Sequence, residues 1–418
     1  MKTKAVRLYG KMDLRLEEFE LPRIKETEML AKVVSDSLCM SSYKAAVQGA
    51  DHKRVPDNVA ENPVIVGHEF CGEVVETGSA VARLAKPGDR FTVQPAMFYK
   101  GSLDAPGYSY PYYGGNATYI IIPEEVFETG TFLRYDGEAF FYGSLAEPMS
   151  CIVGGAHAMY HTVRGSYNHI MDIKEGGNMA ILAGAGPMGL GMVDYMLHRD
   201  RKPAVLTVTD IDEARLLRAQ AIYTEAHAKE MGVALRYVNT NDKDERYVQS
   251  LAGGEGYDDV YVMAPVRQVV EMGDRLLAPD GCLNFFAGPS DCAFSASVNC
   301  YNIHYAATHI CGNSGGNTDD MREAIRLMEE GRVTPAAMIT HVGGLGAARQ
   351  ATLNLPDIPG GKVLIYPPVD FPLTALADFE ELGKKDAVIK ELGTIINKTN
   401  GLWSKEAEDY LLAHAPAI

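Results

Sequence analysis

Four residues of the types that bind metal ions lie in the N-terminal part of this 418-residue chain: Cys39, His68, Glu69 and Glu147. His68 and Glu69 are adjacent inside the apolar run VIVGHEFCGEV, residues 64–74, which predicts a buried strand. A buried carboxylate is costly unless a nearby charge neutralises it, and a divalent cation would do so. Because a thiolate, an imidazole and carboxylates suit zinc, we predict a zinc site whose fourth position is open or exchangeable.

Two other interpretations of the His68-Glu69 pair stay open when these residues are taken alone. His68 could be a core histidine that is bonded to a backbone carbonyl, and Glu69 could lie at a strand edge and pair with a lysine. The zinc interpretation gains weight only when the chain also contains a dinucleotide-binding fold.

Such a fold is indicated by GAGPMG, residues 184–189, which follows the strand-like run MAILA and opens an apolar helix. Gly184 allows a tight turn, Gly186 lets the backbone approach a pyrophosphate, and Gly189 lets helix and strand pack closely. Pro187 and Met188 begin the helix, whose free N–H groups can bind phosphates. We predict that these residues bind the dinucleotide.

Asp210 ends the next strand-like run, about 20 residues past Gly189. Its carboxylate can accept hydrogen bonds from the ribose hydroxyls of NAD and would repel the extra phosphate of NADP. Arg215 and Arg218 lie nearby and could admit a 2′-phosphate. The expected cofactor is therefore NAD(H), with NADP(H) left open.

The elements that must position these residues fall into three segments: 1–155, 156–317 and 318–418. The first contains short alternating runs separated by Gly, Pro and Asp, which predict a twisted antiparallel or barrel-like β domain. The second alternates helical patterns with strand-like runs, as in βαβ units with a parallel sheet. These runs are NMAILAG, AVLTVTD, ALRYVNT, DDVYVMA, GCLNFFAG and THICGNS. The expected fold class is α/β.

The third segment is expected to return to the domain formed by the first segment and to end in a helical C-terminal extension. DDMREAIRLMEEGRV predicts an amphipathic helix with Asn317 and Thr318 as cap candidates and an end near Gly331. About the last 50 residues predict two more helices with a break at Asn400-Gly401, and Trp403 is the expected anchor of this tail.

Composition excludes several classes of protein. The chain has 39 basic and 55 acidic residues, a net charge of −16, which argues against nucleic acid or an anionic membrane as the main partner. The N-terminus lacks the apolar segment of a signal peptide, and no stretch predicts a membrane span. Seven scattered cysteines without C-x-x-C favour free thiols in a reducing cytoplasm.

The motifs C-x-S-S, GHEFCGEVVETG, PGDRFTV, GGNATYIIIP, SLAEPMSC and GAGPMG occur in this order over residues 1 to about 366. The ordered set resembles the zinc-dependent medium-chain dehydrogenase/reductase family, in its polyol dehydrogenase branch. The resemblance implies a GroES-like, β-rich catalytic domain joined to a Rossmann domain with a doubly wound parallel sheet, with zinc in the cleft between them.

Three longer stretches are similar to a group of bacterial reductases that act on L-sorbose 1-phosphate: residues 37–73, LLAPDGCLNFFAGP and HYAATHICGNSGGNTDDMREA. This similarity implies reversible reduction of L-sorbose 1-phosphate to D-glucitol 6-phosphate by NAD(P)H. The alternatives are a sorbitol-like dehydrogenase of unphosphorylated polyols, a zinc-free NADPH reductase of the same fold, and a cofactor-binding protein without catalysis. We also expect a homo-oligomer, either a dimer or a tetramer.

The family's roles carry over where residues match. Cys39, His68 and Glu69 fall on the catalytic zinc ligands, and Glu147 falls on the fourth position. Ser41 falls on the hydroxyl residue that passes a proton to or from the reacting oxygen.

The chain departs from the family at three places. Ser42 stands where an Asp usually supports the ligand histidine, and Lys44 stands at the relay histidine. The segment after PGDR contains no cysteine, whereas many relatives carry a four-cysteine zinc lobe there, so one zinc per subunit is expected.

Lys44, His52, Lys53 and Arg54 form a basic stretch shortly after Cys39 in an otherwise acidic chain. Positive charge of this kind could bind the phosphate of a sugar phosphate, although a solvated surface loop would contain the same residues. We expect His157, His161, His304 and His309 to be structural, with His304 also able to line the cleft.

Overall fold

The computed structural model describes residues 1–163 and 165–418 and divides into two compact units. Unit 1 comprises residues 1–148, 324–329 and 339–418, and unit 2 comprises residues 149–323 and 330–338. Helices α4 (Ala146–His157) and α11 (Thr318–Glu329) each continue from one unit into the other along the chain. Within the described residues, no helix is long and apolar enough to cross a membrane.

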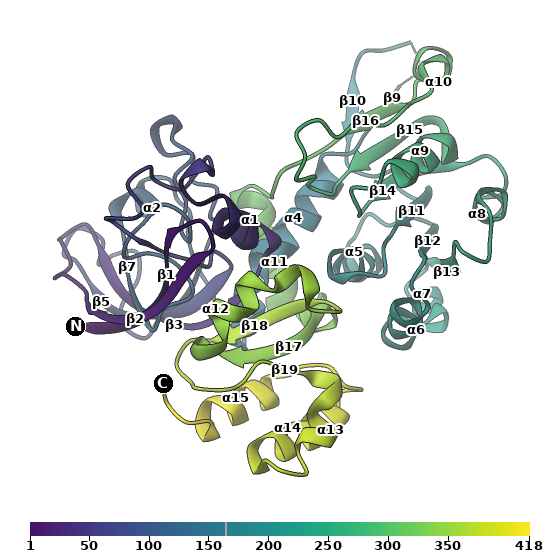
Figure 1. Ribbon diagram of the computed structural model, residues 1–418. Coiled ribbons are helices and arrows are strands. Elements are labelled where there is room, and N and C mark those ends of the chain that lie inside the picture. The colour runs from purple at the N-terminus through teal and green to yellow at the C-terminus, as the bar shows by residue number, and fades with distance from the viewer. Residues whose placement is uncertain (164) are drawn as a thin grey trace. The chain divides into compact units, whose positions relative to one another are not determined.

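Unit 2 is built on a six-stranded parallel sheet in the order β13-β12-β11-β14-β15-β16 (Figure 1). The first strand of this sheet along the chain, β11, lies in the middle and the order reverses beside it, which is the arrangement of a Rossmann dinucleotide-binding sheet. The strands are β11 (Asn178–Leu182), β12 (Val205–Asp210), β13 (Ala234–Asn239), β14 (Tyr257–Val262), β15 (Leu277–Phe285) and β16 (His309–Cys311).

All six strand-like runs of the second segment are therefore strands of one sheet, which confirms the predicted parallel architecture. The helices are α5 (Pro187–His198), α6 (Glu213–Ile222), α7 (Glu225–Glu230), α8 (Glu245–Leu251), α9 (Arg267–Leu276) and α10 (Cys300–Tyr305). The helical pattern at 213–232 is divided, because the hydroxyl of Thr224 accepts a hydrogen bond from the His227 N–H and begins a new helix. A hairpin of β9 (Tyr160–Thr162) and β10 (His169–Met171) completes this unit.

Unit 1 is rich in β-structure, as predicted. An eight-stranded sheet runs β19-β17-β18-β3-β5-β6-β8, with β7 paired to β3, and a three-stranded sheet runs β2-β1-β4. The strands are β1 (Lys2–Gly10), β2 (Asp13–Glu20), β3 (Met29–Ser37), β4 (Val64–Ile65), β5 (Phe70–Thr77), β6 (Arg90–Val93), β7 (Tyr119–Ile122), β8 (Phe132–Arg134), β17 (Ile339–Gly344), β18 (Lys362–Tyr366) and β19 (Thr374–Ala375). Its helices include α1 (Met40–Gln48), α2 (Glu124–Glu128), α3 (Phe140–Ser144) and α12 (Leu345–Leu353).

The run 64–74, predicted as one buried strand, is two strands in different sheets. β4 pairs with β1, β5 pairs with β3, and the chain bends between them at residues 66–69. Gly67 makes the bend possible because its φ is +93° and a side chain there would collide with Asn116 and Asp36. The bend turns His68 and Glu69 out of either strand ladder while leaving both side chains buried.

The C-terminal tail folds onto unit 1 through α13 (Phe379–Leu382), α14 (Ala387–Asn397) and α15 (Lys405–His414). Asn400 and Gly401 have positive φ and separate α14 from α15, as the sequence predicted. Trp403 is 1% exposed, and its indole N–H donates to the hydroxyl of Tyr366 at 2.7 Å, which confirms it as the anchor.

Glu408 of α15 lies at the end of this buried chain of hydrogen bonds. The hydroxyl of Tyr366 and the N–H groups of Phe140 and Phe141 all donate to its carboxylate, at distances of 2.6–3.0 Å. Burial nevertheless raises the pKa of Glu408 from 4.5 to about 7. The tail is therefore attached to α3 and β18 by a carboxyl group that can change its charge near neutral pH.

We expect this carboxyl group to make stability depend on pH. The folded protein holds the proton more tightly than the unfolded chain, so the stabilisation is complete below pH 4.5 and is lost as pH rises through about 7. The loss amounts to about 3 kcal/mol. Melting temperatures measured from pH 5 to 8 should fall less steeply for Glu408→Gln than for the wild type. The control is Glu406→Gln, an exposed residue of the same helix; identical slopes in all three proteins would contradict the assignment.

Candidate functional site

Cys39, His68 and Glu69 converge in unit 1, with one potential ligand atom from each lying within 4.8 Å of the others. Cys39 lies two residues past the end of β3, directly before helix α1, and the other two come from the bend between β4 and β5. His68 is 4% exposed and Glu69 is 2% exposed. Residues separated by 29 positions in the sequence are thus brought together by the turn at Gly67 and the pairing of β3 with β5.

The protonation of this group is set mainly by burial. Burial raises the pKa of the Cys39 thiol to about 12, and the charge of Glu69 adds to the effect. Burial lowers the pKa of His68 to about 4, so its imidazole is neutral at physiological pH, the form that binds metals. In the absence of a cation Cys39 is a thiol, so zinc binding must release its proton.

Glu69 also has a partner within the chain. Its carboxylate accepts hydrogen bonds from the Ser37 hydroxyl and from the Lys362 ammonium, with one Lys362 Nζ–Glu69 Oε1 distance of 2.6 Å. Burial alone would lower the pKa of Lys362, but the charge of Glu69 and the hydrogen bond to it raise that pKa above its usual value. The pairing of Glu69 with a lysine, considered from the sequence, is therefore present. Glu69 nevertheless also lies close to the Cys39 thiol and the His68 imidazole.

The hydroxyl of Ser41 lies against two of these three side chains. It donates to Cys39 Sγ at 3.0 Å and lies 3.3 Å from His68 Nε2. The hydroxyl of Tyr108 donates to Ser41 Oγ at 2.8 Å, and Tyr108 is 1% exposed. On the other side of the imidazole, Ser42 Oγ lies 3.3 Å from His68 Nδ1. A serine hydroxyl thus contacts the imidazole nitrogen that the family's usual Asp would support.

This arrangement fits a zinc ion. A thiol, a neutral imidazole and a carboxylate are among zinc's preferred donor types, and in unit 1 they lie within reach of one ion, with His68 and Glu69 buried and Cys39 half-buried. Two residues were not found from the sequence: Tyr108 and Lys362. Tyr108 lies within a tyrosine-rich loop, and Lys362 lies 293 positions from Glu69, so no local spacing could indicate either contact.

Two further predicted residues lie nearby. Burial is the main cause that raises the pKa of Cys39 and of Tyr108, and the charge of Glu147, half-buried in the first turn of α4, adds to it. Glu147 is outside the group of atoms within 4.8 Å. Lys44 is half-buried on α1, one turn beyond Ser41.

The basic residues 52–54 differ in their contacts. The ring of His52 stacks on Tyr108 with centroids 5.5 Å apart, and the Arg54 guanidinium lies 5.4 Å from the same ring's centroid. The Nε atom of Arg54 is buried and forms no hydrogen bond with any described residue. Lys53 is exposed. His52 and Arg54 therefore contact Tyr108, whose hydroxyl donates to Ser41, whereas Lys53 points into solvent.

In unit 2, the glycine loop lies between β11 and α5. A side chain at Gly189 would collide with the Gly184 carbonyl, and one at Gly184 would collide with Ile181, so both glycines are needed for close packing. No heavy atom lies within 4 Å of where a Gly186 side chain would be. The helix begins at Pro187, followed by Met188, with Gly186 before it. The loop thus leaves open space beside a helix N-terminus, as a pyrophosphate requires.

Asp210 lies at the C-terminal end of β12, directly beside this loop. Its carboxylate accepts hydrogen bonds from the N–H groups of Ala185, Ile211 and Asp212 at 2.8–3.1 Å. Arg215 is paired with Asp212 at 3.5 Å, and Arg218 donates to the Ala337 carbonyl at 2.8 Å.

Three of the four histidines that were expected to be structural form hydrogen bonds with residues of unit 2. His157 bonds Asp320 at 2.7 Å, His161 bonds Asp259 at 3.1 Å, and His309 bonds the Tyr160 carbonyl at 2.9 Å. His304 is exposed on α10.

Two family models match the chain. The model described as an alcohol dehydrogenase GroES-like domain matches residues 25–129, and the model described as a zinc-binding dehydrogenase matches residues 189–330. The mannitol-1-phosphate 5-dehydrogenase of Aliivibrio fischeri is 50% identical over 412 residues, 98% of this chain and 97% of that protein. The L-sorbose 1-phosphate reductase of Klebsiella pneumoniae is 47% identical over 416 residues, 100% of this chain and 98% of that protein.

A solved structure shares the fold. The crystal structure of a zinc-binding dehydrogenase from Sinorhizobium meliloti bound to NADP superposes with a TM-score of 0.69 at 24% identity, covering 88% of this chain and 100% of that chain. The two-part architecture and its GroES-like and Rossmann components thus agree with the expectation from the sequence.

Proposed function

The chain belongs to the zinc-binding medium-chain dehydrogenase/reductase family, and from that premise we propose that it reversibly reduces L-sorbose 1-phosphate to D-glucitol 6-phosphate with NAD(P)H. A zinc-dependent, NAD(P)-linked dehydrogenase of sugar phosphates or polyols is the general class. The finer assignment is carried by one observation: Arg54, with a buried and unbonded Nε, lies against the tyrosine that holds Ser41.

The position of Arg54 favours a substrate whose phosphate is close to its carbonyl group. In L-sorbose 1-phosphate the phosphate is on the carbon next to the C2 carbonyl. Tyr108 joins the two features of the protein, because its ring faces Arg54 and its hydroxyl donates to Ser41 at 2.8 Å. A guanidinium is well suited to a phosphate because it can donate two parallel hydrogen bonds.

Bound zinc would supply Lewis acidity at the ketose carbonyl, and the reduced nicotinamide would supply the hydride. Cys39, His68 and Glu69 would hold the ion, with Glu147 as the candidate for the fourth position. Ser41 is suited to give a proton to the reacting oxygen because its hydroxyl already contacts Cys39 and His68. Tyr108, which donates to Ser41, would replace that proton. Lys44, which occupies the position of the family's relay histidine, would continue the path toward solvent.

A second candidate substrate is mannitol 1-phosphate, favoured by the 50% identity to a mannitol-1-phosphate 5-dehydrogenase. That reaction takes place at carbon 5, four carbons from the phosphate on carbon 1. The two substrates therefore require the phosphate site at different distances from the reacting carbon, and free polyols require no such site.

The substrate panel that tests these proposals comprises L-sorbose 1-phosphate, L-sorbose, D-fructose 6-phosphate and D-fructose, with zinc measured in the same samples. We expect the highest kcat/KM for L-sorbose 1-phosphate. Arg54→Gln should lower that value about 10- to 100-fold, because a hydrogen bond between charged groups is lost, and should change reduction of free L-sorbose far less. Lys53→Gln, the exposed neighbour, is the control. An equal loss on both sugars would contradict the phosphate assignment.

We expect a preference for NADH over NADPH. Asp210 presents a carboxylate beside the glycine loop, while Arg215 and Arg218, the nearby cations that could bind a 2′-phosphate, already have partners. A negative charge at this place repels the 2′-phosphate of NADP. Equal kcat/KM values with the two cofactors would contradict this proposal.

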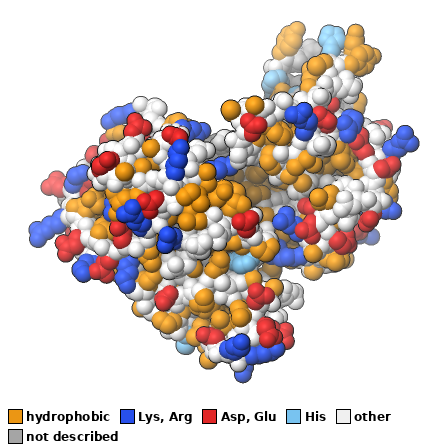
Figure 2. Space-filling view, in the orientation of Figure 1, with side chains coloured by type: hydrophobic (Ala, Val, Ile, Leu, Met, Phe, Trp, Pro, Cys, Tyr) orange, Lys and Arg blue, Asp and Glu red, His pale blue; other side chains and the backbone are white. Residues whose placement is uncertain are grey.

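Assembly as a homo-oligomer, a dimer or tetramer, is supported by the end of unit 2 formed by β10, β16 and α10, where hydrophobic side chains gather on the surface (Figure 2). Exposed apolar side chains there are Ile170, Met171, Tyr301, Tyr305 and Ile310. Strand β16 is an edge of the parallel sheet, and exposed apolar edges are commonly covered by a partner. Sedimentation velocity would test the oligomeric state.

Two other expectations stay proposals: a cytoplasmic location, and the division of the chain into domains after residues 155 and 317.

A further inference from the structure

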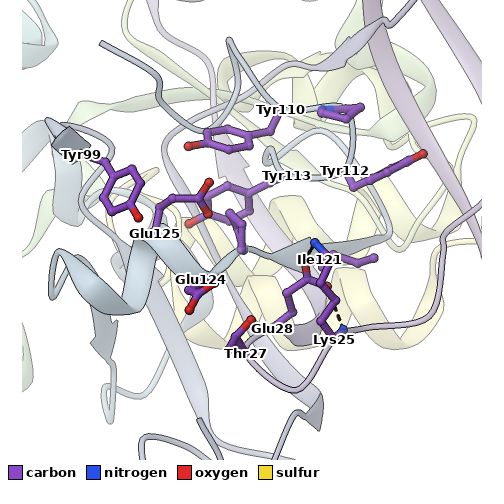
Figure 3. A pocket seen from close by; sticks show the side chains of 12 residues that line it. Lys25, Thr27, Glu28, Tyr99, Tyr110, Tyr112, Tyr113, Ile121, Glu124 and Glu125 are labelled. Carbon is purple, nitrogen blue, oxygen red and sulfur yellow. Dashed lines mark hydrogen bonds and ion pairs between the residues drawn. The ribbon is translucent and has the colours of Figure 1, made fainter. Parts of the chain in front are cut away.

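A pocket of unit 1, of about 270 Å³, is seen from close by in Figure 3, and none of the candidate zinc ligands lines it. Its walls include four tyrosines, Tyr99, Tyr110, Tyr112 and Tyr113. These side chains come from the segment between β6 and β7, and unlike Tyr108 of the same segment they have no role in the proposed reaction. The rest of the wall includes Lys25 and the carboxylates of Glu28, Glu124 and Glu125.

The Tyr113 hydroxyl is buried, yet none of the described residues hydrogen-bonds to it. Tyr113 is 1% exposed, its ring packs edge-on against Phe70 and Tyr110 at centroid distances of 5.7 and 5.8 Å, and its oxygen forms no hydrogen bond with any described residue. In Figure 3 this hydroxyl points toward the side of the pocket that holds Tyr99 and Glu125. A buried hydroxyl without a hydrogen bond is costly, so this atom indicates a polar group of a ligand.

The charge of the pocket is negative. Glu28 is neutralised by Lys25, whose ammonium and backbone N–H both donate to it at 2.9 Å. The carboxylates of Glu124 and Glu125, at the start of α2, form no hydrogen bond or ion pair within the described residues. An anionic ligand would be repelled here, so the substrate phosphate does not suit this pocket.

A cation already contacts one of these rings. The Lys100 ammonium lies 4.4 Å from the centroid of the Tyr99 ring, which shows that this ring accepts a cation on a face. Lys100 does not line the pocket. The combination of aromatic faces, open carboxylates and a hydroxyl that can accept an N–H bond is the environment that an alkylammonium group requires.

We propose that this pocket binds an organic cation, a primary ammonium on a short alkyl chain. The ammonium would donate hydrogen bonds to the Tyr113 hydroxyl and to Glu125, and the alkyl chain would lie against the tyrosine rings. A polyol would also contact the rings and the hydroxyl, but it would leave both carboxylates without a counter-charge, which makes it the weaker fit.

The test is calorimetric titration of the full-length, zinc-loaded protein at low ionic strength with putrescine, a four-carbon diamine. The matched probe is 1,4-butanediol, which has the same carbon chain and no charge. We expect saturable binding of putrescine that is at least about 10-fold tighter than that of the diol and that weakens with added salt. No saturable binding of putrescine, or equal binding of the two probes, would overturn the proposal.

Variants locate the binding. Tyr113→Phe should weaken putrescine binding about 10-fold without lowering the melting temperature of the free protein, because the variant removes a hydroxyl that has no partner. Glu125→Gln should weaken it by a similar factor, whereas Glu128→Gln, an exposed residue of the same helix outside the pocket, should not. An equal effect of Glu125→Gln and Glu128→Gln would mean diffuse attraction to an acidic surface and would overturn the assignment.

Discussion

Replacing Cys39 by serine should lower ketose reduction by at least about 10³-fold while nucleotide binding remains close to that of the wild type. The size follows from the several kcal/mol of Lewis-acid stabilisation that the reaction would lose with the metal, at about 1.4 kcal/mol for each factor of ten. Nucleotide binding should persist because the glycine loop and Asp210 belong to unit 2, whereas Cys39 belongs to unit 1.

Three measurements on the same sample check this prediction: zinc content, steady-state turnover, and NADH binding by fluorescence titration. His68→Ala should behave in the same way, because His68 shares the group with Cys39. Cys292→Ser, which replaces an exposed thiol, is the matched control and should keep both zinc and activity. A metal-free protein with full activity would contradict the proposed chemistry.

The Rossmann half of the fold is the part that the sequence predicts best. The inner strands β11, β12 and β14 are buried almost throughout, so their composition identifies them. The edge strands β13 and β16 are partly exposed and less apolar. The observed order β13-β12-β11-β14-β15-β16 is that of a Rossmann sheet, the fold that the family resemblance implies.

The run 64–74 shows where such patterns fail. Apolar residues at 64–66 and 70–74 predict one strand, yet the two halves join different sheets. The reason is the positive φ of Gly67, a backbone angle that hydrophobic periodicity cannot predict. His68 and Glu69 were still identified, because polar side chains inside an apolar run are unusual whichever element carries them.

The surroundings of the candidate zinc ligands could be predicted only in part. Cys39, His68 and Glu69 were found by residue type and motif. Lys362 and Tyr108 were missed because their roles depend on the pairing of β18 with β3 and on the path of a loop, both long-range features. The hydroxyl of Ser42 against His68 Nδ1 likewise became visible only in three dimensions.

Lys362→Met should destabilise the metal-free protein by about 3–5 kcal/mol, which is on the order of 10 °C in melting temperature. Lys362 and Glu69 are both buried, at 7% and 2% exposure, and removal of the lysine leaves the carboxylate without a counter-charge. Methionine keeps most of the length and apolar volume of the lysine chain, so packing changes little. Lys2→Met, which breaks an exposed ion pair with Glu18, is the control and should leave the melting temperature almost unchanged.

Zinc should reverse most of this loss, because a cation bound by Glu69 would supply the charge that the lysine no longer provides. The melting temperature should therefore rise more on zinc addition in Lys362→Met than in the wild type. Adding Glu69→Gln to Lys362→Met should restore part of the metal-free stability, since no buried charge then remains, and should remove the extra response to zinc. If zinc stabilises Lys362→Met and the wild type equally, Glu69 serves the lysine alone and the ion must be held without it.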